Sequence, residues 1–256
     1  MGISDEGRGA VACVWCGPQG DVERASRIAR GLGCPVRQGV PADGELSLAL
    51  DADGLWLVGD GMRMQGDFSA MEARTRPANL SRELLVRAAK VKGVAAARVV
   101  DATAGMGEDA FLLAAAGFRV TLFERDPVIA ALLADALARA AADERLASTV
   151  ARMSFVAGDS IEALAHWEGP APDVVLLDPM FPARRKSAAV KKKFQLIHRL
   201  ESPCADEADL FGAARAAGPR KIVVKRPPKG PHLAGAAPSY VLQGKAVRYD
   251  CYAFAR

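Results

Sequence analysis

The sequence is poor in aromatic residues and contains no long apolar run. Phe, Trp and Tyr make up 6% of its 256 residues. No apolar stretch approaches the roughly 18 to 20 residues that a membrane-spanning helix needs. The first ten residues, MGISDEGRGA, are polar and lack the apolar core of a signal peptide. These absences argue against an integral membrane protein and against secretion.

Cysteine is scarce as well. The five cysteines are an odd number scattered over the whole length: Cys13, Cys16, Cys34, Cys204 and Cys251. This pattern argues against a disulfide framework and fits a reducing cytoplasm. Cys13 and Cys16 have no second pair, and the three histidines lie far apart in the sequence. We therefore expect no metal site.

The sequence does have enough apolar material for a continuous core. Hydrophobic residues make up 50% of the chain and charged residues 25%, which excludes intrinsic disorder. The length indicates one large domain, or one domain with a small appendage. The net charge of +4 permits a nucleic-acid partner without requiring one.

Residues 1–78 differ in pattern from the rest and predict a small N-terminal α+β region. Asp21 to Gly31 is typical of a helix that stops at Gly31. Glu45 to Leu50 and Gly54 to Val58 flank a turn-rich tetrapeptide and predict a hairpin. A second domain is expected over residues 79–256, and its first helix is predicted over Asn79 to Lys92, capped by Asn79 or Ser81.

From Ala96 onward, apolar strands alternate with helical stretches, the clearest helix being Pro127 to Ala142. The expected strands are Arg98 to Val100, Arg119 to Phe123, Ser154 to Val156, Asp173 to Leu177 and Lys221 to Val224. Such alternation of nearly continuous apolar strands with helices predicts an α/β fold with a doubly wound parallel sheet. Two adjacent strands, Ser239 to Leu242 and Lys245 to Phe254, predict an antiparallel ending.

A glycine-rich loop follows the first of these strands. Gly105 and Gly107 let the backbone turn sharply and let a ligand lie close to it. Asp101 at the strand end would repel a pyrophosphate, and Glu108 and Asp109 at the start of the next helix are equally unsuited to a phosphate. S-adenosylmethionine carries an ammonium and a sulfonium group and no phosphate. The loop therefore favours S-adenosylmethionine, with Asp101, Gly105 and Gly107 shaping its pocket.

Acids follow the next two strands. Glu124 ends the second strand, where a carboxylate accepts both hydroxyls of a ribose. Asp159 follows the third strand, in a position to accept from an adenine amine, although a plain loop acid explains it as well. Both residues indicate an adenosine-containing ligand without identifying it.

The most informative segment is Asp178-Pro179-Met180-Phe181-Pro182, at the end of a buried strand. In open α/β sheets, ligands bind at this edge. Phe181 offers a stacking surface for a planar base, while Asp178 and the Pro179 carbonyl can hold the hydrogens of an exocyclic amine. The amine lone pair is delocalised into the ring, so hydrogen bonds that favour a pyramidal nitrogen raise its reactivity. The segment predicts methyl transfer to such an amine, with Asp178, Pro179 and Phe181 presenting it.

Four stretches together resemble the J-type small-subunit ribosomal RNA methyltransferases. They are VVDATAGMGEDAFLLAAAGFRVTLFERDPVIAALLADALARA (residues 99–140), LLDPMFPARRKSAAVKKK (176–193), KIVVKRP (221–227) and GKAVRYDCYAF (244–254). The resemblance covers about residues 80–256. The N-terminal third departs from it, since residues 71–80 read MEARTRPANL where the family has a basic, glycine-rich stretch.

The resemblance implies a class I S-adenosylmethionine-dependent methyltransferase, with a Rossmann-like, mostly parallel seven-stranded sheet and an antiparallel last strand. It also implies methylation of the N2 amine of a guanosine in small-subunit (16S) ribosomal RNA, with that RNA or the small subunit as partner. The cofactor contacts carried over from the family are Glu108, Asp109, Glu124, Arg125, Asp159, Ser160 and Asp178.

A basic run follows the Asp-Pro segment, with six positive charges and no acid between residues 184 and 193. The RNA-binding residues expected from it and from the end of the fifth strand are Arg184, Arg185, Lys186, Lys191, Lys192, Lys193, Lys225 and Arg226. Beside a base-accepting pocket, such a cluster neutralises phosphates.

Three alternatives remain open from the sequence. The acceptor could be tRNA or another RNA, DNA adenine, or a protein glutamine. Gly105-x-Gly107-x-x-Ala110 also fits a nicotinamide-dependent oxidoreductase. A non-catalytic RNA-binding protein with a degenerate pocket is the third alternative, and the run of acids on successive strand ends argues against it.

Overall fold

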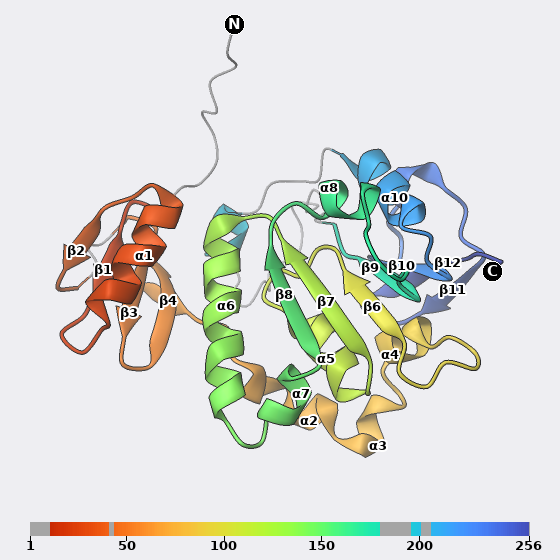
Figure 1. Cartoon of the computed structure of the whole chain (residues 1–256), viewed down its shortest axis with the longest axis horizontal. Helices are drawn as coiled ribbons and strands as arrows, with labels where there is room; N and C mark the ends of the chain where they lie inside the picture. Colours follow the sequence, from red (N-terminus) through yellow and green to blue (C-terminus); the bar gives the residue numbers. More distant parts are fainter. Residues whose placement is uncertain (1–10, 41–43, 180–195, 201–205, 256) are drawn as a thin grey trace, which may run out of the picture. The chain divides into compact units, whose positions relative to one another are not determined.

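The computed structural model describes residues 11–40, 44–179, 196–200 and 206–255, and these fall into two compact units (Figure 1). One unit collects the described residues of Met1–Gly66, Asp126–Arg139 and Met180–Pro203. The other collects those of Asp67–Arg125, Ala140–Pro179 and Cys204–Arg256. The predicted division into domains 1–78 and 79–256 stays a prediction.

The first unit contains a mixed five-stranded sheet with the order β2-β1-β3-β4-β5. Its strands are β1 (Val14–Cys16), β2 (Val36–Gln38), β3 (Ser47–Asp51), β4 (Gly54–Gly59) and β5 (Met62–Met64). Strands β3 and β4 pair antiparallel in the predicted hairpin, while β1 is parallel to both β2 and β3. This unit has the α+β character expected of the N-terminal region.

Helix α1 (Val22–Leu32) belongs to the same unit and begins as expected. The side chain of Asp21 accepts a hydrogen bond from the Arg24 N–H and caps the first turn. The predicted stop at Gly31 is wrong, because the helix runs through Gly31 and ends at Gly33. Gly33 has φ 65°, and its N–H bonds back to the helix, as in a left-handed glycine cap.

Helix α6 (Pro127–Ala142) confirms the clearest helix expected from the sequence. Its buried Asp135 is held by two arginines of the first unit: Nη2 of Arg24 lies 2.6 Å from one carboxylate oxygen, and Nε of Arg139 lies 2.8 Å from the other. The described segment 196–200 joins the same unit, since Arg199 forms an ion pair with Asp60 at 2.8 Å.

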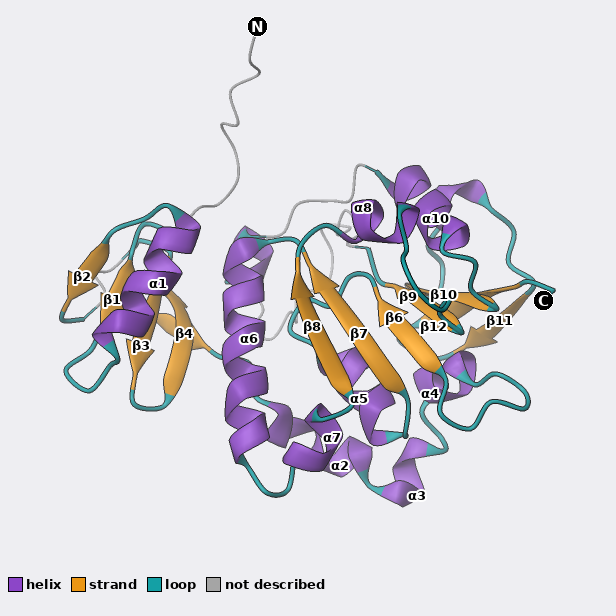
Figure 2. Cartoon of the chain, in the orientation of Figure 1, coloured by secondary structure: helices purple, strands orange, loops and turns teal. Residues whose placement is uncertain are grey.

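The second unit contains a seven-stranded sheet with the order β11-β12-β10-β9-β6-β7-β8 (Figure 2). Its strands are β6 (Arg98–Asp101), β7 (Arg119–Glu124), β8 (Met153–Ala157), β9 (Val174–Leu177), β10 (Lys221–Arg226), β11 (Tyr240–Gln243) and β12 (Arg248–Ala253). Strands β6 to β10 are parallel, and β12 runs antiparallel to both β10 and β11. The predicted parallel sheet and its antiparallel ending are confirmed.

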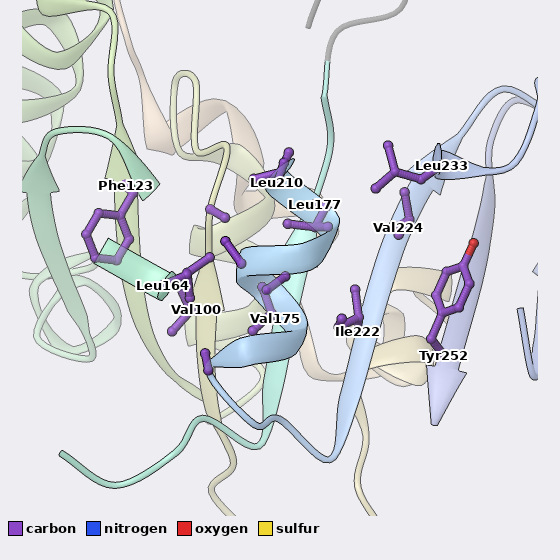
Figure 3. Packing of buried hydrophobic residues seen from close by; sticks show 14 residues of the cluster. Val100, Phe123, Leu164, Val175, Leu177, Leu210, Ile222, Val224, Leu233 and Tyr252 are labelled. Atoms are coloured by element: carbon purple, nitrogen blue, oxygen red, sulfur yellow. The ribbon is translucent and has the colours of Figure 1, made fainter. Parts of the chain in front are cut away.

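One face of this sheet packs against α8 (Ser160–Ala165) and α10 (Glu207–Ala216) (Figure 3). Leu164 and Leu210 from these helices join Val175 and Ile222 in a buried apolar cluster. Helices α4 (Leu84–Ala89) and α5 (Glu108–Ala115) lie against the opposite face (Figure 1). Because both faces of the sheet are covered at its centre, the central strand β9 is apolar and buried along its whole length.

The helix predicted over Asn79 to Lys92 is wrong in extent. The chain forms α3 (Pro77–Leu80), then an extended residue at Glu83, and then α4. Asn79 lies inside α3, where its amide donates to the Ala73 carbonyl, and Arg74 forms an ion pair with Glu83 at 2.9 Å. These local bonds stabilise the break that the apolar spacing does not reveal.

The remaining described helices are short connections. They are η1 (Phe68–Met71), α2 (Glu72–Thr75), α7 (Ala147–Val150), η2 (Ile197–Arg199) and η3 (Leu233–Gly235). Within the described ranges, no helix is long and apolar enough to cross a membrane.

A buried ion pair fixes the loop that follows β10. Asp250 of β12 is fully buried, and both of its oxygens accept from the Arg248 guanidinium, at 2.8 and 3.1 Å. Nδ1 of His232 lies 2.7 Å from the same carboxylate, and Arg248 also donates to the Pro228 carbonyl. Burial opposes ionisation, but the hydrogen bonds from Arg248 and His232 prevail and lower the pKa of Asp250.

We predict that Asp250→Ala lowers the free energy of unfolding by about 3 kcal/mol, because it leaves the Arg248 guanidinium buried without its carboxylate. Urea unfolding at pH 7 measures the change. Glu45→Ala is the matched control: it removes an acid from an exposed pair with Arg37 and should cost less than about 1 kcal/mol. Equal effects of the two substitutions would contradict the role given to Asp250.

Candidate active site

The predicted site residues meet at one edge of the seven-stranded sheet. Asp101 ends β6, Glu124 ends β7, Asp178 directly follows β9, and Lys225 is the penultimate residue of β10. These four strands are parallel neighbours in the order β10-β9-β6-β7. Their carboxyl ends therefore lie side by side, where open α/β sheets bind ligands (Figure 2).

The glycine loop between β6 and α5 is bonded to the strands on either side of it. The Ala102 N–H donates to the Leu176 carbonyl of β9, and the Ala104 N–H donates to the Phe123 carbonyl of β7. Gly105 and Gly107 have φ of 53° and 77°, in the left-handed region that favours glycine. The Gly105 N–H also donates to Oε2 of Glu124 at 2.8 Å. The loop and the predicted ribose-binding acid thus form one preorganised element.

Asp101 lies beneath this loop and is 2% exposed. Its carboxylate accepts a long hydrogen bond, 3.2 Å, from the Thr103 N–H. Burial, together with the nearby charges of Asp109 and Asp178, raises the pKa of Asp101 to about 8. Asp101 is therefore mostly protonated at neutral pH in the free protein.

Asp178 is oriented by two partners. Its N–H donates to the Thr103 hydroxyl at 2.7 Å, and its Oδ2 lies 2.9 Å from the Lys225 ammonium. Lys225 also contacts Oδ2 of Asp109 at 2.6 Å and so bridges two carboxylates. Burial raises the pKa of Asp178 although Lys225 acts to lower it. Burial alone would lower the pKa of Lys225, but the two carboxylates raise it above its usual range.

The side chains at this edge fit S-adenosylmethionine. Asp101, Asp109 and Asp178 place three carboxyl groups around one lysine, which favours a cationic ligand over a phosphate. A Cβ built on Gly105 would meet no atom within 4 Å, so the loop leaves open space on that side. Asp101 would hold the ammonium group and Glu124 the ribose. Among the residues that the structure describes, no group of His, Cys, Asp and Glu is placed to hold a metal ion.

The other predicted cofactor residues lie around the same edge, and their contacts stay predictions. Asp159 follows β8, is exposed, and caps α8 by accepting from the Ile161 N–H at 2.7 Å. Ser160 behind it is buried. Glu108 is exposed at the start of α5, and Arg125 pairs with Asp206 at 3.1 Å.

The predicted base-binding and RNA-binding residues are only partly visible. Pro179 is described and buried, whereas Phe181 and the basic residues between 184 and 193 lie outside the described residues. Arg226 is 1% exposed, and its guanidinium pairs with Glu207 at 3.4 Å. An RNA contact by Arg226 would require its side chain to leave this position.

The sequence analysis missed two groups that support Asp178. Thr103 lies in the glycine loop, but no role was predicted for it, and Lys225 was predicted to contact RNA. A signal for Lys225 does exist: Ile222 and Val224 alternate into the apolar cluster, so a lysine in the next position points to the other face, toward α5.

This fold and this site together define a Rossmann-like S-adenosylmethionine-dependent methyltransferase. The family model described as "Putative SAM-dependent methyltransferase" matches residues 41–254. A solved SAM-dependent methyltransferase from Neisseria gonorrhoeae is 33% identical, with a TM-score of 0.74 over 94% of this chain and 95% of that chain.

Two relatives carry the name ribosomal RNA small subunit methyltransferase J. The one from Thioalkalivibrio sulfidiphilus is 44% identical over 90% of this chain and 92% of its own length. The one from Ectopseudomonas mendocina is 43% identical over 85% and 86%. The chain belongs to this family, and its cofactor is S-adenosylmethionine rather than a nicotinamide dinucleotide. The match also extends well before residue 80, where the resemblance noted in the sequence began.

We predict that the stability of Asp101→Asn relative to the wild type depends on pH. Between pH 4 and about pH 8 the folded wild type keeps a proton on Asp101 that the unfolded chain releases. Wild-type stability therefore falls as pH rises through this window and levels off above it. The advantage of the Asn variant, which carries no such proton, should grow by a few kcal/mol over the same range.

Urea unfolding of the cofactor-free protein from pH 5 to pH 9 measures this difference. Glu108→Gln, which replaces an exposed acid beside the same loop, is the control for the loss of one carboxyl group. A constant difference for Asp101→Asn would show that Asp101 is ionised throughout.

Proposed function

We propose that the protein transfers a methyl group from S-adenosylmethionine to the exocyclic N2 amine of a guanosine in small-subunit (16S) ribosomal RNA. The observation that carries the proposal is Asp178, a partly exposed carboxylate held beside the cofactor loop by Thr103 and Lys225. The names of the relatives support the RNA class. The small ribosomal subunit or its RNA is the partner.

When bound, S-adenosylmethionine supplies an electrophilic methyl carbon on a sulfonium. The chain's own residues position the amine and prepare its lone pair. Asp178 accepts a hydrogen bond from the amine, which favours a pyramidal nitrogen and stabilises the positive charge that develops on it. Phe181 stacks on the base and a proline carbonyl holds the second hydrogen. Asp178 need not remove a proton beforehand, because the methylated nitrogen is acidic enough to lose one afterwards.

We also place the protein in the cytoplasm, together with its ribosomal substrate. The four cysteines among the described residues, Cys13, Cys16, Cys34 and Cys251, are all free thiols. Unpaired thiols spread along a chain suit a reducing compartment.

Transfer of labelled methyl to three acceptors tests the function. The acceptors are small ribosomal subunits and naked small-subunit RNA, both from cells that lack this gene, and tRNA. Digestion of the product to nucleosides should yield labelled N2-methylguanosine from the small-subunit RNA. Label in tRNA alone, or in a different nucleoside, would overturn the proposed acceptor while leaving the enzyme class intact.

We predict that Asp178→Asn lowers kcat by on the order of 100-fold, because the amide cannot provide the negative charge that stabilises the transition state. Affinity for S-adenosylhomocysteine, measured by calorimetry, should change much less. The control is Asp209→Asn, an exposed acid on α10, which should keep wild-type turnover. Wild-type kcat in Asp178→Asn would exclude the role given to the carboxylate.

We predict that RNA binding weakens steeply with salt through the basic residues between 184 and 193. Replacing Lys191, Lys192 and Lys193 together by Gln should reduce the slope of log K against log salt by about 2, since each phosphate contact to single-stranded RNA contributes about 0.7. Filter binding at several potassium chloride concentrations measures the slope. An unchanged slope would remove this run from the RNA contact surface.

A further inference from the structure

Lys225 occupies an unusual position for a residue expected to bind RNA. Its ammonium lies 2.6 Å from Oδ2 of Asp109 and 2.9 Å from Oδ2 of Asp178. A quarter of its side chain is exposed. An ammonium already shared by two carboxylates has little attraction left for a phosphate, so these contacts favour a role inside the site.

The three bonded residues come from three different elements. Asp109 lies in the first turn of α5, directly after the glycine loop, Asp178 follows β9, and Lys225 is near the end of β10. Strand β10 is the parallel neighbour of β9, and their pairing ends at Val224 and Leu177, one residue before Lys225 and Asp178. Lys225 therefore ties the helix behind the cofactor loop to the acid that faces the acceptor.

Other titratable groups lie around Asp178 and Lys225. Asp101 of β6 interacts with Asp109, Asp178 and Lys225. Arg226 acts on Asp178, and Tyr249 of β12, which is 4% exposed, interacts with Asp109, Asp178 and Lys225. Arg74 of α2 acts on Tyr249. Lys225 is the cation that bonds directly to Asp178 in the described part of the chain.

We propose that Lys225 is a positioning residue of the methyl transfer: by holding Oδ2 of Asp178, with Asp109 as its second anchor, it keeps that carboxylate oriented and charged to accept the target amine. The inference rests on the proposed function, since it assigns Lys225 a task in that reaction. It replaces the RNA contact that the sequence predicts for this lysine.

Lys225→Met, Lys225→Arg and the control Lys245→Met test the inference by steady-state kinetics on the acceptor that the wild type methylates. Lys245 is an exposed lysine between β11 and β12, so its substitution removes the same charge away from the site. We expect Lys225→Met to lower kcat more than about 10-fold at pH 7 with KM for RNA within about twofold, because Oδ2 of Asp178 then loses the ammonium that orients it and keeps it charged. Lys225→Arg should restore part of kcat, and Lys245→Met should match the wild type.

The pH profile separates positioning from a purely structural role. Without the ammonium, the pKa of Asp178 rises further. The acid limb of the plot of kcat against pH should therefore move to higher pH, by about one unit or more. Activity of Lys225→Met should then recover in part at high pH. An unchanged limb together with a raised KM and a reduced salt slope would show that Lys225 contacts RNA phosphate and would overturn the inference.

A measurement without turnover keeps this inference separable from the proposed function. Carbon-13 NMR of protein labelled in its aspartate carboxyls, with the Asp178 signal assigned by Asp178→Asn, gives the titration midpoint directly. The midpoint should rise in Lys225→Met and fall in Asp109→Asn, which removes a like charge. If the wild type methylates no RNA, the proposed function fails, and these two midpoints alone decide whether Lys225 controls Asp178. Midpoints unchanged from the wild type in folded variants would refute it.

Discussion

The candidate active site, at the edge of the seven-stranded sheet, depends on one ammonium group placed among three carboxyl groups. Asp101, Asp109 and Asp178 are brought together by the sheet order and by the loop between β6 and α5. Burying like charges in one place is costly unless a cation or a proton offsets them. Lys225 supplies the cation for two of these acids, and protonation neutralises the third at neutral pH. The residual negative character is what an ammonium-bearing and sulfonium-bearing cofactor requires.

The same edge is also rigid in its backbone. The cofactor loop donates hydrogen bonds to β7 on one side and to β9 on the other, and its Gly105 N–H holds the carboxylate of Glu124. The Thr103 hydroxyl accepts from the Asp178 N–H, so a residue of the glycine loop also fixes the acid to which we assign the acceptor. A site ordered before ligands arrive loses little conformational freedom when they bind. The residues that we propose to hold the cofactor and the acceptor therefore belong to a single hydrogen-bonded unit.

The parts of this structure that the sequence predicts are those determined by local pattern. Parallel strands of a covered sheet are mostly apolar runs, which is why the sequence predicts β6 to β10, and an acid after such a run marks a ligand edge. The end of α1 was misplaced because two glycines lie two positions apart, and only Gly33 adopts the left-handed conformation. The bond between Lys225 and Asp109 was not predicted, because the two residues are 116 positions apart in the sequence. A run of charges can be recognised in a single sequence. An ion pair between residues this far apart in the sequence can be recognised only in the folded structure.

The order in which the first unit is assembled has a consequence for synthesis on the ribosome. Its five-stranded sheet is complete by Met64, yet Asp135 and Arg199, which pair with Arg24 and Asp60, are translated much later. Between Asp135 and Arg199 the ribosome makes β8 and β9, which belong to the other unit. At 5 to 20 residues per second, the chain spends seconds with that sheet finished and its later contacts absent. The nascent chain therefore carries a finished small sheet while Arg24 and Asp60 still await their ion-pair partners.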